Sequence, residues 1–253
     1  MKVLVVGCNG HMGQIVCKLA KESETFNVVA GFDKVAREFP EFPVFEKIED
    51  LNSFFGEYPG IVDVIIDFSL PEATMKVLES AVEYKVPMVI ATTNISEDQQ
   101  KKIEEASKEI KIFKAANMSY EIKLLEDILR MVAPKLADYD IEIVEEHHNR
   151  KADAPSGTAK VLAQAINDSL GGDREIVKEY DGKREKKQIG VHSVRGGNIV
   201  GVHTIKFIGM SDELEITHRA QSRDMFAEGA LKAAKWLVEN KNDAGLYNMS
   251  DMD

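Results

Sequence analysis

The sequence predicts a doubly wound parallel α/β sheet at the N-terminus, followed by a second domain of mixed α+β structure. Short apolar runs alternate with amphipathic stretches through the first half, which is the pattern of a parallel sheet covered by helices on both faces. A glycine-rich turn follows the first apolar run directly, as in Rossmann-like folds. The second half replaces this alternation with a dense charge run and with strand-like segments around a Gly-Gly turn.

Five strands and three helices are expected in the first half. Each strand is a short apolar run bounded by turn residues, and the five cover residues 2–6, 27–32, 61–68, 86–91 and 110–115. The helices have one apolar face and cover residues 12–21, 71–84 and 96–109. Ser96 is the expected N-cap of the last helix, because acidic residues fill the turn that follows it.

The second half is expected to hold helical or amphipathic segments over residues 122–136, 158–170 and 225–238. Residues 140–145 alternate like a half-buried strand, and the segments 191–194, 201–209 and 214–218 are expected to be antiparallel strands. Residues 248–253 are expected to form a loose tail after the last helix.

Composition excludes several classes of protein. The chain has 253 residues, of which 43 are acidic and 32 basic, and its net charge of −11 argues against general binding to nucleic acid or to an anionic membrane. No apolar run approaches the roughly 18–20 residues that a membrane helix needs. Cys8 and Cys17 form no CxxC motif and no disulfide framework, which is typical of a reducing compartment. We therefore expect a cytoplasmic globular protein.

The first turn carries a dinucleotide-binding pattern. It reads Gly7-Cys8-Asn9-Gly10-His11-Met12-Gly13, and its GxxGxxG spacing lets the chain turn tightly and brings backbone N–H groups close to a pyrophosphate. Asp33 ends the second predicted strand, where a carboxylate can bind the adenosine ribose diol. The alternatives are an ordinary turn and a carboxylate that caps a helix. The first strand, the glycine-rich turn and an acid at the end of the second strand follow one another in the expected order. Together they favour binding of NAD.

Lys34 bears on the choice of cofactor. A cation beside the ribose-binding acid can pair with a 2′-phosphate, which a lone aspartate would repel. NADH and NADPH are therefore both candidates, with Asp33 favouring NADH. A solvated side chain is the alternative interpretation of Lys34.

Two further loops follow predicted strands at the edge where open α/β sheets bind ligands. Their small and hydroxyl side chains suit the nicotinamide ribose and carboxamide, and they read Ala91-Thr92-Thr93-Asn94 and Ala115-Ala116-Asn117-Met118-Ser119. Each loop taken alone is also compatible with ordinary turn chemistry.

The densest polar cluster spans residues 145–158, after a predicted strand and at the start of a helix. Its cationic side chains are His147, His148, Arg150 and Lys151. Backbone N–H groups of Gly157 and Thr158 lie at the helix N-terminus, and such groups bind carboxylates, as cations do. Histidine and lysine can also donate the proton that hydride addition to a C=N or C=C bond requires.

Other interpretations of this cluster remain open. Metal binding would use His147 and His148 with Glu145 and Glu146, but neither an H-x₃-H nor an HExxH spacing is present, and we expect no metal. The paired histidines can serve only structural hydrogen bonds, and residues 153–157 can be only a capped helix start. Ser156 lies in no GxSxG elbow, which argues against a hydrolase.

The stretch from Glu145 to Ala159 is similar to the E-x-H-H-x-x-K-x-D-A-P-S-G-T-A signature of the 4-hydroxy-tetrahydrodipicolinate reductases, also called dihydrodipicolinate reductases, of bacterial lysine and diaminopimelate biosynthesis. Further similarities cover essentially the whole chain and comprise residues 7–13, Asp67-Phe68-Ser69 with Pro71, Thr92-Thr93, and residues 115–119, 192–197, 201–203 and 222–230.

This resemblance implies a dinucleotide-binding domain over residues 1–118, completed by residues 224–253, and a substrate-binding and tetramerisation domain over 119–223. It implies hydride transfer from NAD(P)H to the cyclic dicarboxylate made by dihydrodipicolinate synthase, with loss of water. By the same resemblance, His147 is the proton donor and Lys151 its cationic partner. The substrate is held by His148, Lys151, Ser156, Gly157 and Thr158. A homotetramer is the expected assembly.

The chain departs from the family pattern at four places. His11 and Lys34 stand where relatives often have arginine, which weakens the case for strong use of NADPH. The family's GTTG reads Ala91-Thr92-Thr93-Asn94, and its N-F-S-x-G reads Asn117-Met118-Ser119-Tyr120-Glu121. Two other functions stay open: a two-domain reductase of a different small imine, and a dinucleotide-binding module without catalytic activity.

Overall fold

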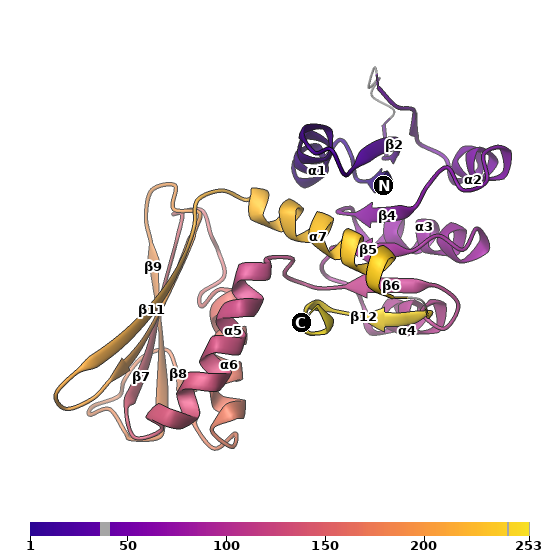
Figure 1. Cartoon of the computed structure of the whole chain (residues 1–253). Coiled ribbons are helices and arrows are strands. Elements are labelled where there is room, and N and C mark those ends of the chain that lie inside the picture. The colour runs from indigo at the N-terminus through magenta and orange to yellow at the C-terminus, as the bar shows by residue number, and fades with distance from the viewer. Residues whose placement is uncertain (36–40, 242, 253) are drawn as a thin grey trace. The chain divides into compact units, whose positions relative to one another are not determined.

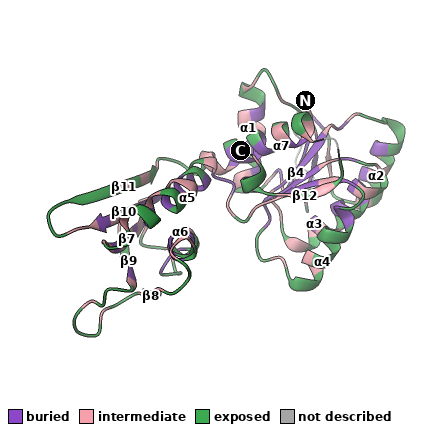
Figure 2. Ribbon diagram, turned by 60° about the horizontal axis from the view of Figure 1, so that its bottom comes forward, coloured by how far each residue is buried: buried purple, intermediate pink, exposed green. Residues whose placement is uncertain are grey.

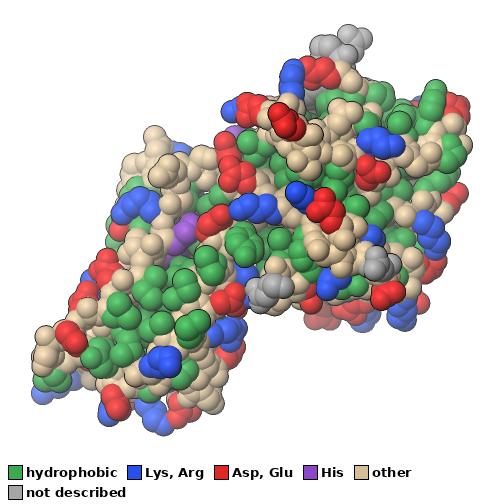
Figure 3. All heavy atoms as spheres, viewed as in Figure 1, with side chains coloured by type: hydrophobic (Ala, Val, Ile, Leu, Met, Phe, Trp, Pro, Cys, Tyr) green, Lys and Arg blue, Asp and Glu red, His purple; other side chains and the backbone are tan. Residues whose placement is uncertain are grey.

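The computed structural model describes residues 1–35, 41–241 and 243–252 (Figure 1). The chain divides into two units: unit 1 contains residues 1–119 and the chain from residue 224 onward, and unit 2 contains Tyr120–Arg223. No helix in these described ranges is long and apolar enough to cross a membrane. On the face drawn in Figure 3, acidic and basic side chains are interspersed and do not gather in one basic patch.

Unit 1 contains a seven-stranded, wholly parallel sheet with the strand order β12-β6-β5-β4-β1-β2-β3. Its strands are β1 (Lys2–Val6), β2 (Asn27–Phe32), β3 (Val44–Phe45), β4 (Val64–Asp67), β5 (Met88–Ile90), β6 (Lys111–Lys114) and β12 (Gly245–Tyr247). Its helices are α1 (His11–Glu22), α2 (Ile48–Glu57), α3 (Pro71–Glu83), α4 (Glu97–Ala106) and α7 (Asp224–Asn240). The predicted doubly wound sheet is confirmed, while β3 and α2 are elements that the sequence reading did not include.

Helices cover both faces of this sheet, and its central strands β1, β4 and β5 are buried on both sides (Figure 2). Val3 and Val5 of β1 belong to a core shared with α1 and α7. Leu4 and Val6, which alternate with them, belong to a second core shared with α2, α3 and α4. This double burial explains why β1 is an unbroken apolar run. The predicted cap of α4 is also confirmed, since Ser96 and Gln99 form a reciprocal capping box.

Unit 2 contains a five-stranded mixed sheet with the order β11-β10-β7-β9-β8, and its helices α5 and α6 lie on one side of it (Figure 1). The strands are β7 (Asp140–His147), β8 (Glu175–Val177), β9 (Gln188–Arg195), β10 (Gly201–Ile208) and β11 (Glu213–Ala220). The helices are α5 (Tyr120–Val132), the short 3₁₀ helix η1 (Ala133–Leu136) and α6 (Gly157–Ser169). Ile141 and Ile143 of β7 pack with both helices in a third core.

The pairing of β9 differs from the prediction. β10 is antiparallel to both β7 and β11, as the sequence suggests, but β9 is parallel to β7. The chain leaves β7 and passes through α6 before it enters β9, and a crossover of this kind joins parallel neighbours rather than a hairpin. Because of this crossover, the ends of β7 and β9 lie at the same edge, which places Arg195 opposite His147.

The predicted loose tail is also wrong. After α7 the chain adds β12 to the edge of the unit 1 sheet, beside β6. A short 3₁₀ helix, η2 (Met249–Asp251), follows and is capped by Asn248. Met249 is buried in the core shared with α1 and α7, and this apolar contact fixes the segment. Residue 253 of the predicted tail lies outside the described residues.

Candidate active site

Glycines shape the turn between β1 and α1. Gly7 has a positive φ of 78°, which favours glycine. A Cβ atom at Gly13 would lie 2.1 Å from the carbonyl oxygen of Gly7, so a side chain there would push the helix away from the strand. The turn is thus built for close approach of backbone, as the sequence pattern predicts.

A pocket of about 480 Å³ opens beside this turn. It is lined by Gly7, Asn9, Gly10, Phe32, Asp33, Lys34, Glu46, Phe68, Ser69, Leu70, Glu72, Ala73 and Lys76. The Asp33 carboxylate accepts the backbone N–H of Asn9 at 2.9 Å and that of Lys34 at 2.7 Å. These two bonds leave further acceptor sites on the carboxylate for a sugar diol. Lys76 is a second cation in this lining that the sequence reading missed.

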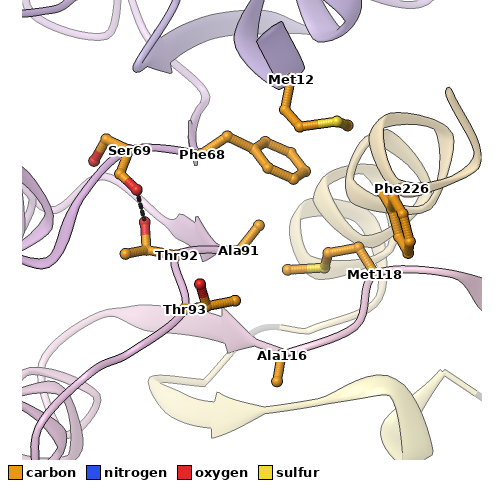
Figure 4. Close-up of a pocket in the computed structure, with 9 residues that line it drawn as sticks. All are labelled: Met12, Phe68, Ser69, Ala91, Thr92, Thr93, Ala116, Met118 and Phe226. Atoms are coloured by element: carbon orange, nitrogen blue, oxygen red, sulfur yellow. Dashed lines mark hydrogen bonds between the residues drawn. The ribbon is translucent and has the colours of Figure 1, made fainter. Parts of the chain in front are cut away.

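A second pocket lies at the carboxyl ends of β4, β5 and β6 (Figure 4). Its lining is Met12, Phe68, Ser69, Ala91, Thr92, Thr93, Ala116, Met118 and Phe226. Phe68 and Ser69 belong to both linings, so the two pockets share a wall. The predicted loops after β5 and β6 therefore meet in one place. The signal for Phe68 and Ser69 was their position directly after the β4 strand.

Several predicted cofactor residues lie outside both linings, namely Cys8, His11, Gly13, Ala115 and Asn117. Cys8 is fully buried, and a Cβ at Gly31 would lie 2.7 Å from its sulfur. The side-chain oxygen of Asn117 accepts the backbone N–H of Ser119 at 2.9 Å and shapes the loop after β6. Cys8 and Asn117 therefore pack or shape the turns of unit 1 without lining either pocket.

The two pockets fit a dinucleotide. The glycine turn leaves no room for a Cβ at Gly7 or Gly13, and Asp33 offers a carboxylate where the ribose of such a ligand lies in folds of this kind. The second pocket combines apolar walls with the hydroxyl groups of Ser69, Thr92 and Thr93, which suits a flat amide-bearing ring.

In unit 2, the fully buried carboxylate of Glu145 organises the polar cluster. One of its oxygens accepts bonds from Ser193 Oγ at 2.6 Å, from Arg195 at 2.6 Å and from the Ser156 backbone N–H at 3.1 Å. The other accepts from Arg195 at 2.9 Å and contacts His147 Nδ1 at 2.5 Å. Burial would raise the pKa of Glu145, but these hydrogen bonds outweigh it and lower the pKa to about 2. Glu145 is therefore an ionised carboxylate, which can accept hydrogen bonds but cannot donate one.

This charge state determines how His147 is protonated. Because Glu145 can only accept, Nδ1 of His147 carries a proton and donates it to the carboxylate. The working nitrogen is thus Nε2, which is the atom nearest to a Cβ placed on Gly201, at 3.1 Å. A proton given to a ligand would therefore leave from Nε2, while the contact between Nδ1 and Glu145 holds the ring in this orientation.

The N-terminus of α6 lies against the same group. Ser156 is its N-cap, and its hydroxyl accepts the backbone N–H of Ala159 at 3.2 Å. That hydroxyl also lies 3.2 Å from Nε2 of His203, whose ring packs edge-on against His147 with centroids 5.3 Å apart. Burial, followed by the charge of His147, lowers the pKa of His203 to about 4, so this ring is neutral near pH 7. A Cβ at Gly157 would meet no atom within 4 Å, so the protein leaves room beside this residue in the first turn of α6.

The loop between β7 and α6 is cationic, as predicted. Lys151 Nζ lies 2.8 Å from a carboxylate oxygen of Asp153, and Arg150 donates to the side chain of Asn198 at 3.0 Å. The pKa of His148 is lowered by desolvation and then by the charges of nearby cations, Arg150 first among them. The described residues contain no group of three or more His, Cys, Asp or Glu side chains that could hold a metal ion.

Sequence reasoning missed the roles of Glu145, Ser193, Arg195 and His203 in this arrangement. A signal for Glu145 was present, because it occupies an apolar-face position of the alternating strand β7. A charged residue on a buried face requires partners, and here Arg195 and Ser193 are those partners.

A parallel sheet with a glycine turn, joined to a unit that holds an oriented histidine, defines a class of protein: a two-unit oxidoreductase that uses a nicotinamide cofactor. Two family models match the chain, "Dihydrodipicolinate reductase, N-terminus" over residues 1–118 and "Dihydrodipicolinate reductase, C-terminus" over residues 121–252. The chain belongs to the dihydrodipicolinate reductase family.

Curated relatives agree with this assignment. The 4-hydroxy-tetrahydrodipicolinate reductase of Caldanaerobacter subterraneus subsp. tengcongensis is 47% identical over 100% of this chain and 98% of the relative. That of Clostridium novyi is 42% identical over 99% and 97%. A solved structure, the dipicolinate-bound dihydrodipicolinate reductase from Paenisporosarcina sp. TG-14, has the same fold, with a TM-score of 0.80, 23% identity, and coverage of 98% of this chain and 97% of that one.

Proposed function

We propose that this chain catalyses the NAD(P)H-dependent reduction of 4-hydroxy-tetrahydrodipicolinate to tetrahydrodipicolinate, the step that its curated relatives are named for. The observation that carries the proposal is the contact between Glu145 and His147 beside the N-terminus of α6. It joins an oriented proton donor to a site that binds carboxylates, and a cyclic dicarboxylate reduced by hydride needs both.

In this proposal unit 1 is the cofactor domain. Asp33 and the turn from Gly7 to Gly13 bind the adenosine and pyrophosphate part, and the loops from Ala91 to Thr93 and from Ala115 to Met118 hold the nicotinamide end. The cofactor supplies the hydride. Thr92 and Thr93 place hydroxyl groups in the lining of that pocket, and Met12, Met118 and Phe226 supply its apolar wall.

Unit 2 is the substrate domain in this proposal. Ser156, Gly157 and Thr158 bind one carboxylate at the start of α6, and the cations His148 and Lys151 attract the dianion. His147 donates from Nε2 the proton that accompanies the hydride, while Glu145 holds the ring through Nδ1. The reaction then consumes one hydride and one proton and releases one water.

Asp33 and Lys34 determine the cofactor preference in this proposal. The carboxylate of Asp33 binds the ribose diol of NADH and repels the 2′-phosphate of NADPH. Lys34 is exposed and lies in the same lining, where its ammonium group can pair with that phosphate. We therefore propose that NADH is preferred and that NADPH is also used.

We also propose a homotetramer built through unit 2. Its support is the family resemblance, together with the position of α5 and α6 on one side of the sheet, which leaves the other side without these helices (Figure 1). The molar mass of the protein in solution, measured by light scattering during gel filtration, tests this assembly.

The activity is tested with substrate generated by dihydrodipicolinate synthase and with NADH or NADPH, by following the nicotinamide absorbance. Oxidation that requires the synthase, faster with NADH, is expected. Oxidation of neither cofactor, in a protein that binds NADH, would contradict the proposal and favour a binding module. Turnover only with a different cyclic or open-chain imine would assign the chain to another reductase activity.

A further inference from the structure

His203 is a buried polar residue to which the proposed reaction gives no role. It is the third residue of β10 and is only 4% exposed. Its side chain lies on the same face of the strand as Ile205 and Phe207, which belong to the core under α5 and α6. A polar ring on such a face is costly to bury unless it is hydrogen-bonded. The contacts of His203 therefore indicate what it does.

The first contact of His203 is with the helix end that we assign to a substrate carboxylate. Its Nε2 lies 3.2 Å from Oγ of Ser156, the N-cap residue of α6. A serine hydroxyl can donate and accept, so this bond forms whichever ring nitrogen of His203 carries the proton. Ser156 Oγ also accepts the backbone N–H of Ala159 at 3.2 Å. The hydroxyl thus joins the first turn of α6 to β10.

The backbone of Ser156 is held from the neighbouring strand. Its N–H donates to the Glu145 carboxylate at 3.1 Å, and Glu145 lies directly opposite His203 in the pairing of β7 with β10. Ser156 is therefore attached to the sheet twice, to β7 through its backbone and to β10 through its side chain. These two bonds fix the start of α6, and with it the N–H groups of Gly157 and Thr158.

The second contact of His203 is with the proposed proton donor. The ring centroids of His203 and His147 lie 5.3 Å apart and their planes meet at 72°, an edge-to-face arrangement. Glu145 holds the His147 ring through Nδ1. His203 therefore contacts both groups that the proposed reaction needs, which are the proton donor and the cap of the carboxylate site.

We propose that His203 is a positioning residue that fixes the start of α6 relative to the His147 ring, and so determines how tightly the substrate carboxylate is bound. The inference rests on the proposed function, because it takes the N-terminus of α6 as the site of that carboxylate. A carboxylate there accepts N–H groups whose place depends on Ser156. When the bond from His203 is removed, the side chain of Ser156 loses its attachment to the sheet, and a displacement of about 1 Å is enough to weaken a positioned contact strongly.

The test is a double-mutant cycle on the affinity for a dicarboxylate. His203→Phe keeps an aromatic ring beside His147 and removes the bond to Ser156, while Ser156→Ala removes the other partner. The probe is pyridine-2,6-dicarboxylate, titrated by calorimetry with NADH present, because its binding needs no turnover. His203→Phe is expected to raise its Kd about tenfold. In a protein that already carries Ser156→Ala, the same change is expected to raise the Kd less than about twofold, since the bond is already absent.

Two further variants distinguish positioning from packing. His218→Phe is the matched control: His218 lies opposite His203 on β11, with ring centroids 6.5 Å apart, and among the described contacts it has no bond to Ser156. It is expected to bind the probe as wild type does. His203→Gln is the conservative variant, because its amide can bond to the Ser156 hydroxyl, and its Kd is expected within about threefold of wild type. If His203→Phe does not fold, His203→Asn takes its place, since its amide is one bond shorter than that of glutamine.

The outcomes separate this inference from the proposed function. A wild-type protein that does not bind the dicarboxylate would overturn both. A wild-type protein that binds it but oxidises neither NADH nor NADPH in the synthase-coupled assay would overturn the proposed reaction, while the cycle still decides the role of His203. An unchanged Kd in His203→Phe, or an equal effect of this change with and without the Ser156 hydroxyl, would overturn that role alone. Equal weakening in His203→Phe, His203→Gln and His218→Phe would also overturn it, since it would reduce His203 to a residue that packs the sheet.

Discussion

Nδ1 of His147 lies 2.5 Å from a carboxylate oxygen of Glu145, two residues earlier on the same strand. The two side chains share a face of β7 because residues i and i+2 point the same way. Arg195, on the neighbouring strand β9, holds Glu145 with both terminal nitrogens of its guanidinium. The orientation of the histidine thus depends on the parallel pairing of β7 with β9.

Glu145 makes the stability of unit 2 depend on pH in the acidic range. Its pKa is lowered from an ordinary value of 4.5 to about 2 in the fold, so its contribution to stability is present above about pH 5 and is lost as pH falls towards 2. The shift corresponds to about 3 kcal/mol. His203, with a pKa lowered to about 4, adds a loss as pH falls from 6.5 to 4, because its protonated form favours the unfolded chain.

Urea unfolding at several pH values measures this dependence. Glu145→Gln is expected to show a smaller loss of stability between pH 5 and 2 than wild type. Glu146→Gln, one residue further and on the opposite face of β7, is the matched control and is expected to keep the wild-type slope. An identical acid dependence in wild type and in Glu145→Gln would contradict the assigned charge state.

Gly157 tests the carboxylate site at the start of α6. The protein itself leaves room for a Cβ there, so Gly157→Ala is expected to fold with unchanged stability. A ligand that approaches the helix end closely would meet the new methyl group, and we expect the KM for the dicarboxylate to rise about tenfold with little change in NADH affinity. Gly56→Ala, an equally open position in α2, serves as the control and should leave the KM unchanged. A wild-type KM in Gly157→Ala would contradict the proposal that the substrate binds at this helix end.

Asp33 and Lys34 are expected to separate the two cofactors. Asp33→Ala removes the acceptor for the ribose diol and should weaken NADH about tenfold while NADPH is affected less. Lys34→Met should weaken NADPH and spare NADH. Titration of each variant with both cofactors checks these directions. Equal effects on NADH and NADPH in Asp33→Ala would show that Asp33 does not bind the ribose diol.

The sequence was sufficient for the features that depend on local pattern. β1, the glycine turn and the N-cap Ser96 follow from apolar runs and short-range chemistry, and the structure confirms them. The loops after β5 and β6 could be placed at one edge because parallel strands end there together.

Features set by distant contacts could not be read in this way. The strand around residue 191 was visible, but its parallel partner depends on the path of the chain through α6. β12 has only three residues, and its pairing with β6 is supported by the burial of Met249, which no local pattern indicates. The role of Arg195 was hidden for the same reason, since 50 residues separate it from Glu145.

The proton-donating role of His147 is tested by the turnover of His147→Gln in the synthase-coupled assay, with NADH affinity measured on the same preparation. Glutamine keeps a polar side chain, but its amide cannot act as a general acid in the way that an imidazole can. We predict that kcat falls by about 100-fold or more, while the Kd for NADH stays near the wild-type value. Turnover at the wild-type rate would contradict proton donation by His147 and exclude this residue from the reaction.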